Sequence, residues 1–222
     1  MNILVTCGPA HEPIDEVRRI TNFSTGRLGI GLANHLASLG HHVTCLIGHH
    51  ATCRTEIRAA RIETFSTAAS LASAIEALSR GPGADAIFHA AAVSDFTVRQ
   101  IEDPDGQTLR HAKIPSSAKE IRLVLQPAPK ILPRLRAWFP DAFLVGWKYE
   151  LDGDRDAAIT RAIAQVTRCR TDLCVLNGRA YGSGFGICEA SGLAEHARGH
   201  HEMFAALEAR LTQNQAGSHA PP

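Results

Sequence analysis

Short apolar runs alternate along this chain with longer stretches in which apolar residues recur every three or four positions. The short runs predict β-strands at residues 2–8, 42–48, 62–65 and 84–93. The longer stretches predict helices at residues 27–39 and 68–80. Gly40 ends the first of these helices, and Ser24 or Thr25 is a candidate N-cap. Such alternation is typical of an α/β protein, in which we expect these four strands to be parallel and central.

The pattern changes between residues 95 and 126, where polar and apolar residues alternate around the turn sequences DPDG and PSSAKE. This excursion predicts antiparallel strands that form a flap. Helices and strands then resume, with elements predicted at residues 129–138, 143–149, 154–169, 172–177 and 201–211. The glycine-rich segment 178–192 predicts a loop. We expect one domain over residues 1–212 and a disordered tail at 213–222.

Composition and charge narrow the class of protein. The 222 residues carry a formal net charge of +1, which provides no long-range field for nucleic acid or an anionic membrane. A hydrophobic strand starts at the N-terminus, so no signal peptide is expected, and no apolar run reaches membrane-spanning length. The six cysteines form no C-x-x-C pair, and no histidine pair has helical spacing with a carboxylate partner. We expect a cytoplasmic protein without metal-binding residues of its own.

A glycine-rich stretch at residues 20–31, ITNFSTGRLGIG, precedes the first predicted helix. Backbone N–H groups at such a helix start form an anion site, which favours a phosphate ligand. Alternatively, Gly26, Gly29 and Gly31 only allow the helix to pack tightly on the sheet. A nicotinamide dinucleotide is disfavoured, because Gly26 lies far beyond the end of the first strand and neither tyrosine starts a Tyr-x-x-x-Lys motif.

The motifs GPAHEPID, ITNFSTGRLG, AAAVSDF, HAKI and VLN, in this order, resemble the phosphopantothenate–cysteine ligase family, the C-terminal-domain family of the DNA/pantothenate metabolism flavoproteins. The resemblance implies a three-layer Rossmann-like (ribokinase-like) fold with a mostly parallel sheet and a flap that forms a homodimer. It implies that 4'-phosphopantothenate and L-cysteine are joined through an acyl-nucleotide, with release of pyrophosphate, in coenzyme A biosynthesis. CTP or ATP is the implied co-substrate, with Mg²⁺ carried in by the triphosphate.

The resemblance also implies site residues. Those that contact the nucleotide are Gly8, Ser24, Gly26, Gly29, Lys113, Trp147 and Asn177. Those that contact the acid substrate are Arg18, Asn22, Ala91, Ala92 and Asp95, with Arg18 reaching the phosphate bound to the neighbouring subunit. Asn22 and Lys113 are the implied catalytic residues. The Asn22 amide stabilises the acyl-nucleotide stage, and the Lys113 ammonium stabilises charge that develops on the phosphates.

Several roles have a structural alternative. Asn22 could be a turn residue, Asp95 a cap, Trp147 a core residue, and Lys113 a lysine that protects a sheet edge. The sequence also departs from the family pattern. Pro115 and Ser116 replace the later lysines of the family's Lys-Ile-Lys-Lys motif, so Lys113 carries its charge alone. Leu176 stands for the alanine before Asn177, and the basic residues of the preceding helix are Arg161, Arg168 and Arg170. The choice between CTP and ATP therefore stays open.

Because the chain begins at its first strand, we expect no FMN-dependent decarboxylase half in it and a separate phosphopantothenoylcysteine decarboxylase in the pathway. Three alternatives stay open. One is a related nucleotide-dependent enzyme that activates another acid, the second is a non-catalytic nucleotide-binding module, and the third is an NAD(P)-dependent dehydrogenase.

Overall fold

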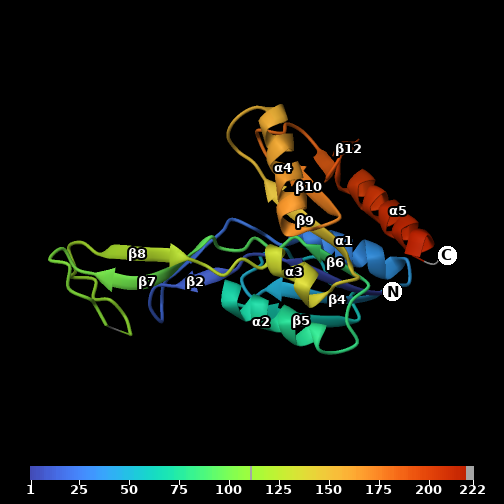
Figure 1. Cartoon of the computed structure of the whole chain (residues 1–222). Coiled ribbons are helices and arrows are strands. Elements are labelled where there is room, and N and C mark those ends of the chain that lie inside the picture. The colour runs from blue at the N-terminus through green and yellow to red at the C-terminus, as the bar shows by residue number, and fades with distance from the viewer. Residues whose placement is uncertain (111, 219–222) are drawn as a thin grey trace.

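Eight strands of the computed structural model, which describes residues 1–110 and 112–218, join into one sheet in the order β12-β11-β10-β9-β6-β1-β4-β5. Figure 1 shows how the helices and strands are arranged in space. These strands are β1 (Asn2–Cys7), β4 (His42–Gly48), β5 (Arg61–Phe65), β6 (Ala86–His89), β9 (Phe143–Tyr149), β10 (Leu173–Asn177), β11 (Phe185–Glu189) and β12 (Gly192–Ala197). From β5 to β10 all neighbours are parallel, in the strand order of a Rossmann fold. The predicted α/β class and mostly parallel sheet are confirmed.

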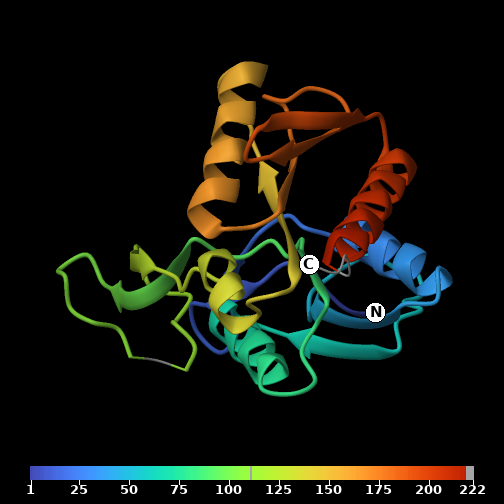
Figure 2. The ribbon, with the colours of Figure 1, turned by 45° about the vertical axis from the view of Figure 1, so that its right-hand side comes forward.

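Helices cover both faces of this sheet and make it three-layered (Figure 2). Helices α1 (Arg27–Ser38) and α5 (His200–Ser218) pack on one face over a core that includes Val5 and Phe88. Helices α2 (Ala68–Ser79), α3 (Leu132–Trp138) and α4 (Arg155–Cys169) cover the other face. The central strands are buried on both sides, which is why their sequences read as nearly continuous apolar runs.

Four details differ from the sequence-based expectation. Strand β5 lies at the sheet edge and is not central, because the chain crosses from β5 back over β1 to β6. The N-cap of α1 is Gly26, with φ +81° and no side-chain cap bond of its own, and the Thr25 hydroxyl accepts the Arg27 N–H at 3.3 Å from just outside the helix. The segment expected to be a loop contains β11 and the start of β12, an antiparallel hairpin added to β10. Helix α5 continues to Ser218, into the expected tail, whose residues 219–222 lie outside the described range.

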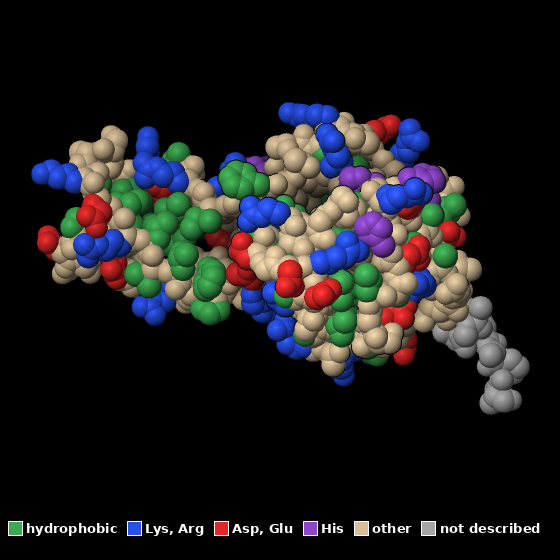
Figure 3. Space-filling view, turned by 90° about the horizontal axis from the view of Figure 1, so that it is seen from above, with side chains coloured by type: hydrophobic (Ala, Val, Ile, Leu, Met, Phe, Trp, Pro, Cys, Tyr) green, Lys and Arg blue, Asp and Glu red, His purple; other side chains and the backbone are tan. Residues whose placement is uncertain are grey.

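The flap is present as expected, formed by antiparallel strands β7 (Phe96–Glu102) and β8 (Arg122–Pro127) that extend away from the sheet (Figure 1). Hydrophobic side chains gather on its surface (Figure 3), where Phe96 and Leu125 are 54% and 44% exposed. A second hairpin, β2 (His11–Pro13) with β3 (Arg19–Thr21), was not expected from the sequence. His111, the first residue of the HAKI motif, lies outside the described residues. None of the helices described here is both long and apolar enough to cross a bilayer.

Candidate functional site

The carboxyl ends of β1 and β6 meet where the strand order reverses, the position at which open α/β sheets bind ligands. The chain segments that leave these two strands stay paired beyond the sheet. Ala92 donates its N–H to the Gly8 carbonyl at 2.9 Å, and Ala10 donates to the Ala92 carbonyl at 3.0 Å. Two of the expected site residues, Gly8 and Ala92, are therefore in direct contact.

Asn22 joins this pair from the loop after β3. Its Nδ2 donates to the Ala92 carbonyl at 3.1 Å, although the two residues are 70 positions apart in the chain. The neighbouring Thr21 hydroxyl donates to the Ala10 carbonyl at 2.9 Å, which ties the β2–β3 hairpin to the same edge. Asn22 is thus held at the switch point by tertiary contacts and is exposed.

The glycines before and inside α1 serve two different purposes. Gly8 and Gly26 have φ values of +78° and +81°, and a Cβ on them would lie 3.0 and 3.2 Å from the Ala51 Cβ. They shape the loop that leads into α1. A Cβ on Gly29 would lie 2.2 Å from the Cys7 Cβ, so Gly29 lets α1 pack on β1. Gly31 similarly faces Phe204 of α5, which supports the packing alternative for these two glycines.

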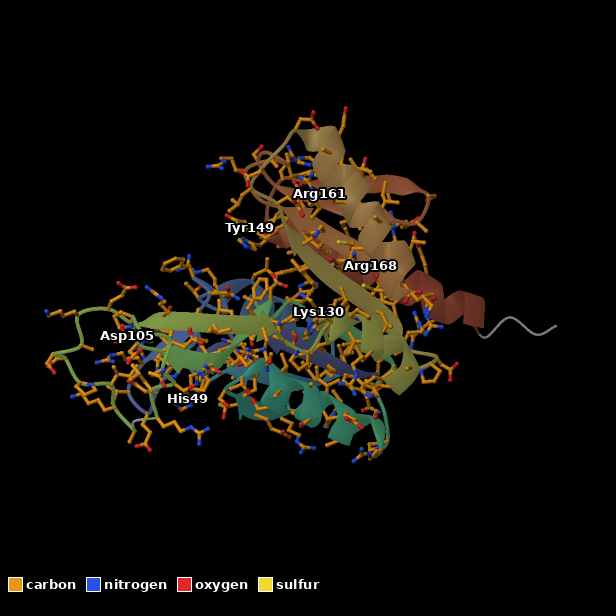
Figure 4. The ribbon with its side chains drawn as sticks, turned by 60° about the vertical axis from the view of Figure 1, so that its left-hand side comes forward. His49, Asp105, Lys130, Tyr149, Arg161 and Arg168 are labelled. Atoms are coloured by element: carbon orange, nitrogen blue, oxygen red, sulfur yellow. The ribbon has the colours of Figure 1, made fainter. Side chains whose placement is uncertain are left out.

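A cavity of about 600 Å³ opens beyond the ends of β6 and β9, bordered by α3 and α4. The expected site residues Ala91, Asp95 and Trp147 line it. Three cationic side chains also line it, those of Lys130, Lys148 and Arg168. Lys130 and Arg168 are labelled in Figure 4. This concentration of positive charge suits a polyanionic ligand such as a triphosphate.

The cations of the cavity differ in their partners. Lys130 forms an ion pair with Asp95, and Lys148 Nζ lies 3.0 Å from Glu150 Oε1. Arg168, on the last turn of α4, is exposed and forms no ion pair with the residues that the structure describes. Sequence reasoning noted Arg168 only as a departure from the family pattern and missed Lys130 and Lys148. The available signal was position, since Lys148 lies near the carboxyl end of β9 and Lys130 lies just before α3.

His89 is a further residue of the cavity that the sequence analysis did not single out. It ends β6, is only 7% exposed, and its Nδ1 lies 2.8 Å from the Thr6 Oγ1. Burial lowers the pKa of His89 to about 4, so the imidazole is neutral at physiological pH. A neutral imidazole carries one N–H donor and one acceptor, which makes it a polar group without charge among the cations of the cavity.

Other expected residues have mainly structural contacts. Trp147, which also lines the cavity, is partly buried and packs against the core, and its Nε1 is buried without a partner among the described residues. The Asn177 carbonyl accepts a hydrogen bond from the Glu150 N–H at 2.9 Å, and Asn177 does not line the cavity. Ser24 is half-buried in the loop before α1. Asp95 is occupied by its ion pair with Lys130.

At the base of the flap, Arg18 contacts the segment that carries Lys113, away from the residues that line the cavity. The Arg18 guanidinium contacts the Asp15 carboxylate at 3.1 Å and donates to the Ile114 carbonyl at 3.1 Å. Burial raises the pKa of the Asp15 carboxyl, but N–H donors from Ile114, Val17 and Arg18 outweigh it and bring the pKa below its usual value. Lys113, directly before Ile114, is exposed.

The histidines offer no metal site among the residues described. His49 and His50 follow β4, and the His50 ring lies 4.8 Å from that of His11, but no group of three or more potential ligands could hold a metal ion in residues 1–110 and 112–218.

A second cavity, of about 630 Å³, opens elsewhere, between Asp172 and α5. Arg210 and Glu189, which line it, form an ion pair with each other.

This arrangement defines an α/β protein with a Rossmann-like sheet and a cationic cavity at its carboxyl edge, the position at which open α/β sheets bind ligands. Residues 1–212 match the family model described as "DNA/pantothenate metabolism flavoprotein C-terminal domain", and the chain belongs to this family. One curated relative is the coenzyme A biosynthesis bifunctional protein CoaBC of Thermococcus kodakarensis. It is 34% identical over 182 residues, which are 82% of this chain and 42% of the relative. The chain therefore spans less than half the length of that relative.

Solved structures agree on the fold. The DNA/pantothenate metabolism flavoprotein from Streptococcus pneumoniae superposes with a TM-score of 0.84 at 24% identity, covering 96% of this chain and 99% of that one. A histidine-to-alanine mutant of Cab2, solved in complex with phosphopantothenate-cysteine, superposes with a TM-score of 0.71 at 20% identity. It covers 99% of this chain and 89% of its own. At these identities the likeness shows a shared three-layer fold.

Proposed function

We propose that this chain is a phosphopantothenate–cysteine ligase that joins 4'-phosphopantothenate to L-cysteine through an acyl-nucleotide in coenzyme A biosynthesis. The observation that carries this proposal is the cationic cavity at the carboxyl edge, which adjoins the paired residues Asn22 and Ala92. Membership of the family and the likeness to CoaBC and Cab2 support it. A related enzyme that activates another acid is the alternative, because none of the described residues that line the cavity is specific for the pantothenate chain.

The proposed reaction has two steps. A carboxylate oxygen of the acid attacks the α-phosphorus of the nucleotide, and the bond to pyrophosphate breaks. The amine of cysteine then attacks the acyl carbon, the bond to the nucleoside monophosphate breaks, and the amine gives up a proton. Both steps build charge on oxygens, so they need hydrogen-bond donors and cations and no nucleophilic side chain. The Asn22 amide and the three cavity cations supply groups of this kind.

In this proposal the triphosphate lies along Lys130, Lys148 and Arg168, and Gly8, Ser24 and Gly26 border the phosphates from the loop before α1. CTP or ATP is the co-substrate, and Mg²⁺ arrives with it. Ala91, Ala92 and Asp95 border the acid. A phosphopantothenoylcysteine decarboxylase, separate from this chain or fused to it as in CoaBC, acts on the product, and the reaction takes place in the cytoplasm.

We also propose that the flap pairs with the flap of a second copy. The exposed apolar residues Phe96 and Leu125 support this, because a hydrophobic sheet face is stable when another chain covers it. A homodimer would bring Arg18 and Lys113, at the flap base, to the partner's site. Light scattering should report a dimer, and Lys113→Ala should keep the dimer while slowing turnover. A fully active monomer contradicts the dimer, and unchanged turnover of Lys113→Ala removes the lysine's role.

The proposed function is tested by pyrophosphate release in the presence of phosphopantothenate, cysteine and either CTP or ATP. Release should require the acid and Mg²⁺. Without cysteine the acyl-nucleotide should accumulate, detectable by mass spectrometry of the quenched mixture. If neither nucleotide releases pyrophosphate, this chain is not a ligase of phosphopantothenate, and release with other carboxylic acids then identifies the alternative substrate.

A further inference from the structure

Thr6 and His89 form a buried hydrogen-bonded pair between β1 and β6. The Thr6 hydroxyl is fully buried, and it accepts the Ala91 N–H at 3.3 Å. Its other contact is the His89 Nδ1 at 2.8 Å. A hydroxyl has one hydrogen to donate, and a buried donor without an acceptor costs about 1–3 kcal/mol. Among the described residues the His89 Nδ1 is the only acceptor within reach, so the hydroxyl hydrogen points to it.

This arrangement selects one tautomer of the imidazole. When Nδ1 accepts from Thr6, the proton of the neutral ring must sit on Nε2. Nε2 has no hydrogen-bond partner among the described residues, but this atom is not completely buried. His89 lines the cavity, and Nδ1 is turned to Thr6, so we take Nε2 to be the ring nitrogen that faces the cavity. The cavity therefore receives a fixed N–H donor from the end of β6.

We infer that His89 binds an anionic oxygen of the ligand through its Nε2–H, and that Thr6 acts as a positioning residue that holds the ring in this tautomer. This rests on the proposed function only for the identity of the ligand, since the oxygen can belong to the carboxylate of the acid or to a phosphate of the nucleotide. The neighbourhood fits an anion, because Lys130, Lys148 and Arg168 line the same cavity. Unlike these cations, His89 donates a hydrogen bond without adding charge, because its pKa is lowered to about 4 by burial.

The tautomer is tested first, in the wild-type protein without ligand. Nitrogen NMR of the His89 ring should show a protonated Nε2 and an unprotonated Nδ1 at neutral pH. The opposite tautomer would overturn the inference, whether or not the protein is a ligase. Thr6→Val removes the hydroxyl at nearly constant shape and should give a mixture of tautomers, whereas Thr6→Ser keeps the hydroxyl and should preserve the wild-type spectrum.

Binding is tested by calorimetry with phosphopantothenate, with CTP or ATP plus Mg²⁺, and with inorganic pyrophosphate as a probe that needs no ligase activity. His89→Leu should weaken binding of one of these by about tenfold to a hundredfold, the value of one hydrogen bond to a charged acceptor. His89→Gln keeps an N–H donor and should restore most of that affinity. The ligand whose binding weakens identifies the oxygen. If a folded His89→Leu variant binds all three ligands as tightly as the wild type, the inference is overturned. If the wild type binds pyrophosphate but not phosphopantothenate, only the proposed function is contradicted.

A pH series separates a neutral donor from a cationic one. The affinity ratio of wild type to His89→Leu should stay constant between about pH 6 and 8, because the neutral ring does not titrate there. The other titratable groups that line the cavity, Asp95, Lys130, Lys148, Arg168 and Cys169, are present in both proteins, so their effects cancel in the ratio. A ratio that rises as the pH falls would mean that His89 binds as an imidazolium, which contradicts the inference.

Discussion

The loop before α1 and the cavity beside α3 and α4 lie at the same edge of the sheet but are built from different groups. The loop is made of backbone, with Gly8 and Gly26 in left-handed conformations, and its buried Gly29 packs against Cys7. The cavity is made of side chains, with three cations and the buried His89. The glycines form a recognisable motif, yet part of that motif is explained by packing. The charges that a triphosphate needs come from segments without any motif.

The largest effect is expected for Asn22, which connects the two regions through the Ala92 carbonyl. Asn22→Ala should lower the rate of conversion by a transition-state free energy of about 2.7–4 kcal/mol, the typical value of one oxyanion donor. Its free energy of unfolding should change little, because the side chain is exposed. Quenched-flow kinetics with mass spectrometry measures the acyl-nucleotide. If this variant had wild-type kinetics, Asn22 would have no role in the reaction, and the reacting groups would have to be stabilised by the cavity residues alone.

The pH dependence of stability tests the buried His89 of the cavity. Folded His89 has a pKa of about 4, against about 6.5 for an unfolded histidine. The unfolded state therefore binds more protons between these values, so stability is full above about pH 6.5 and falls as the pH drops toward 4. The pKa difference corresponds to about 3 kcal/mol.

Urea unfolding of wild type and His89→Gln at several pH values measures this contribution of His89 to the free energy of unfolding. The variant should lose less stability on acidification, whereas His42→Gln, at an exposed position, should behave as wild type. Equal acid sensitivity of His89→Gln and wild type would show that other groups dominate the acid response.

Nucleotide binding tests which region holds the triphosphate. CTP or ATP with Mg²⁺, at a hundredfold excess over Kd, should raise the free energy of unfolding by about 2.7 kcal/mol. Arg168→Met should reduce this gain at the same ligand concentration, because Arg168 lines the cavity. Arg99→Met, on the exposed side of flap strand β7, is the matched control. If Arg99→Met also lost this increase in the free energy of unfolding, or if Arg168→Met retained it in full, the nucleotide would bind outside the cavity. Stabilisation by NADH or NADPH alone would favour a dehydrogenase.

The smallest effect concerns the packing of α1. Gly29→Ala should lower the free energy of unfolding by about 1–3 kcal/mol, because its Cβ would lie 2.2 Å from the Cys7 Cβ. Gly81→Ala, whose Cβ meets only the Leu78 carbonyl at 3.5 Å, should have little effect. Chemical denaturation gives both values. If Gly29→Ala instead abolished nucleotide binding at unchanged stability, the glycine would act on the phosphates and the packing explanation would be wrong.

Much of the fold could be predicted because burial leaves a periodic pattern. The parallel strands read as apolar runs, and α2 and α4 show apolar positions at helical spacing. The β11–β12 hairpin was missed because glycines surround it and β12 is mostly exposed, so its pattern is weak. The N-cap was missed because Gly26 adopts a left-handed conformation, which leaves Ser24 and Thr25 outside the helix.

The sequence by itself determined the order of the helices and parallel strands, the flap and the family, since these depend on local pattern and motif. Only the tertiary structure decided the cavity. Strand order brings the ends of β6 and β9 together, and with them Lys130, Lys148 and Arg168, which no spacing in the chain connects. The pairing of Thr6 with His89, 83 positions apart, has the same cause. Local propensity acts over a few residues, whereas a site at the carboxyl edge exists only after distant strands have paired.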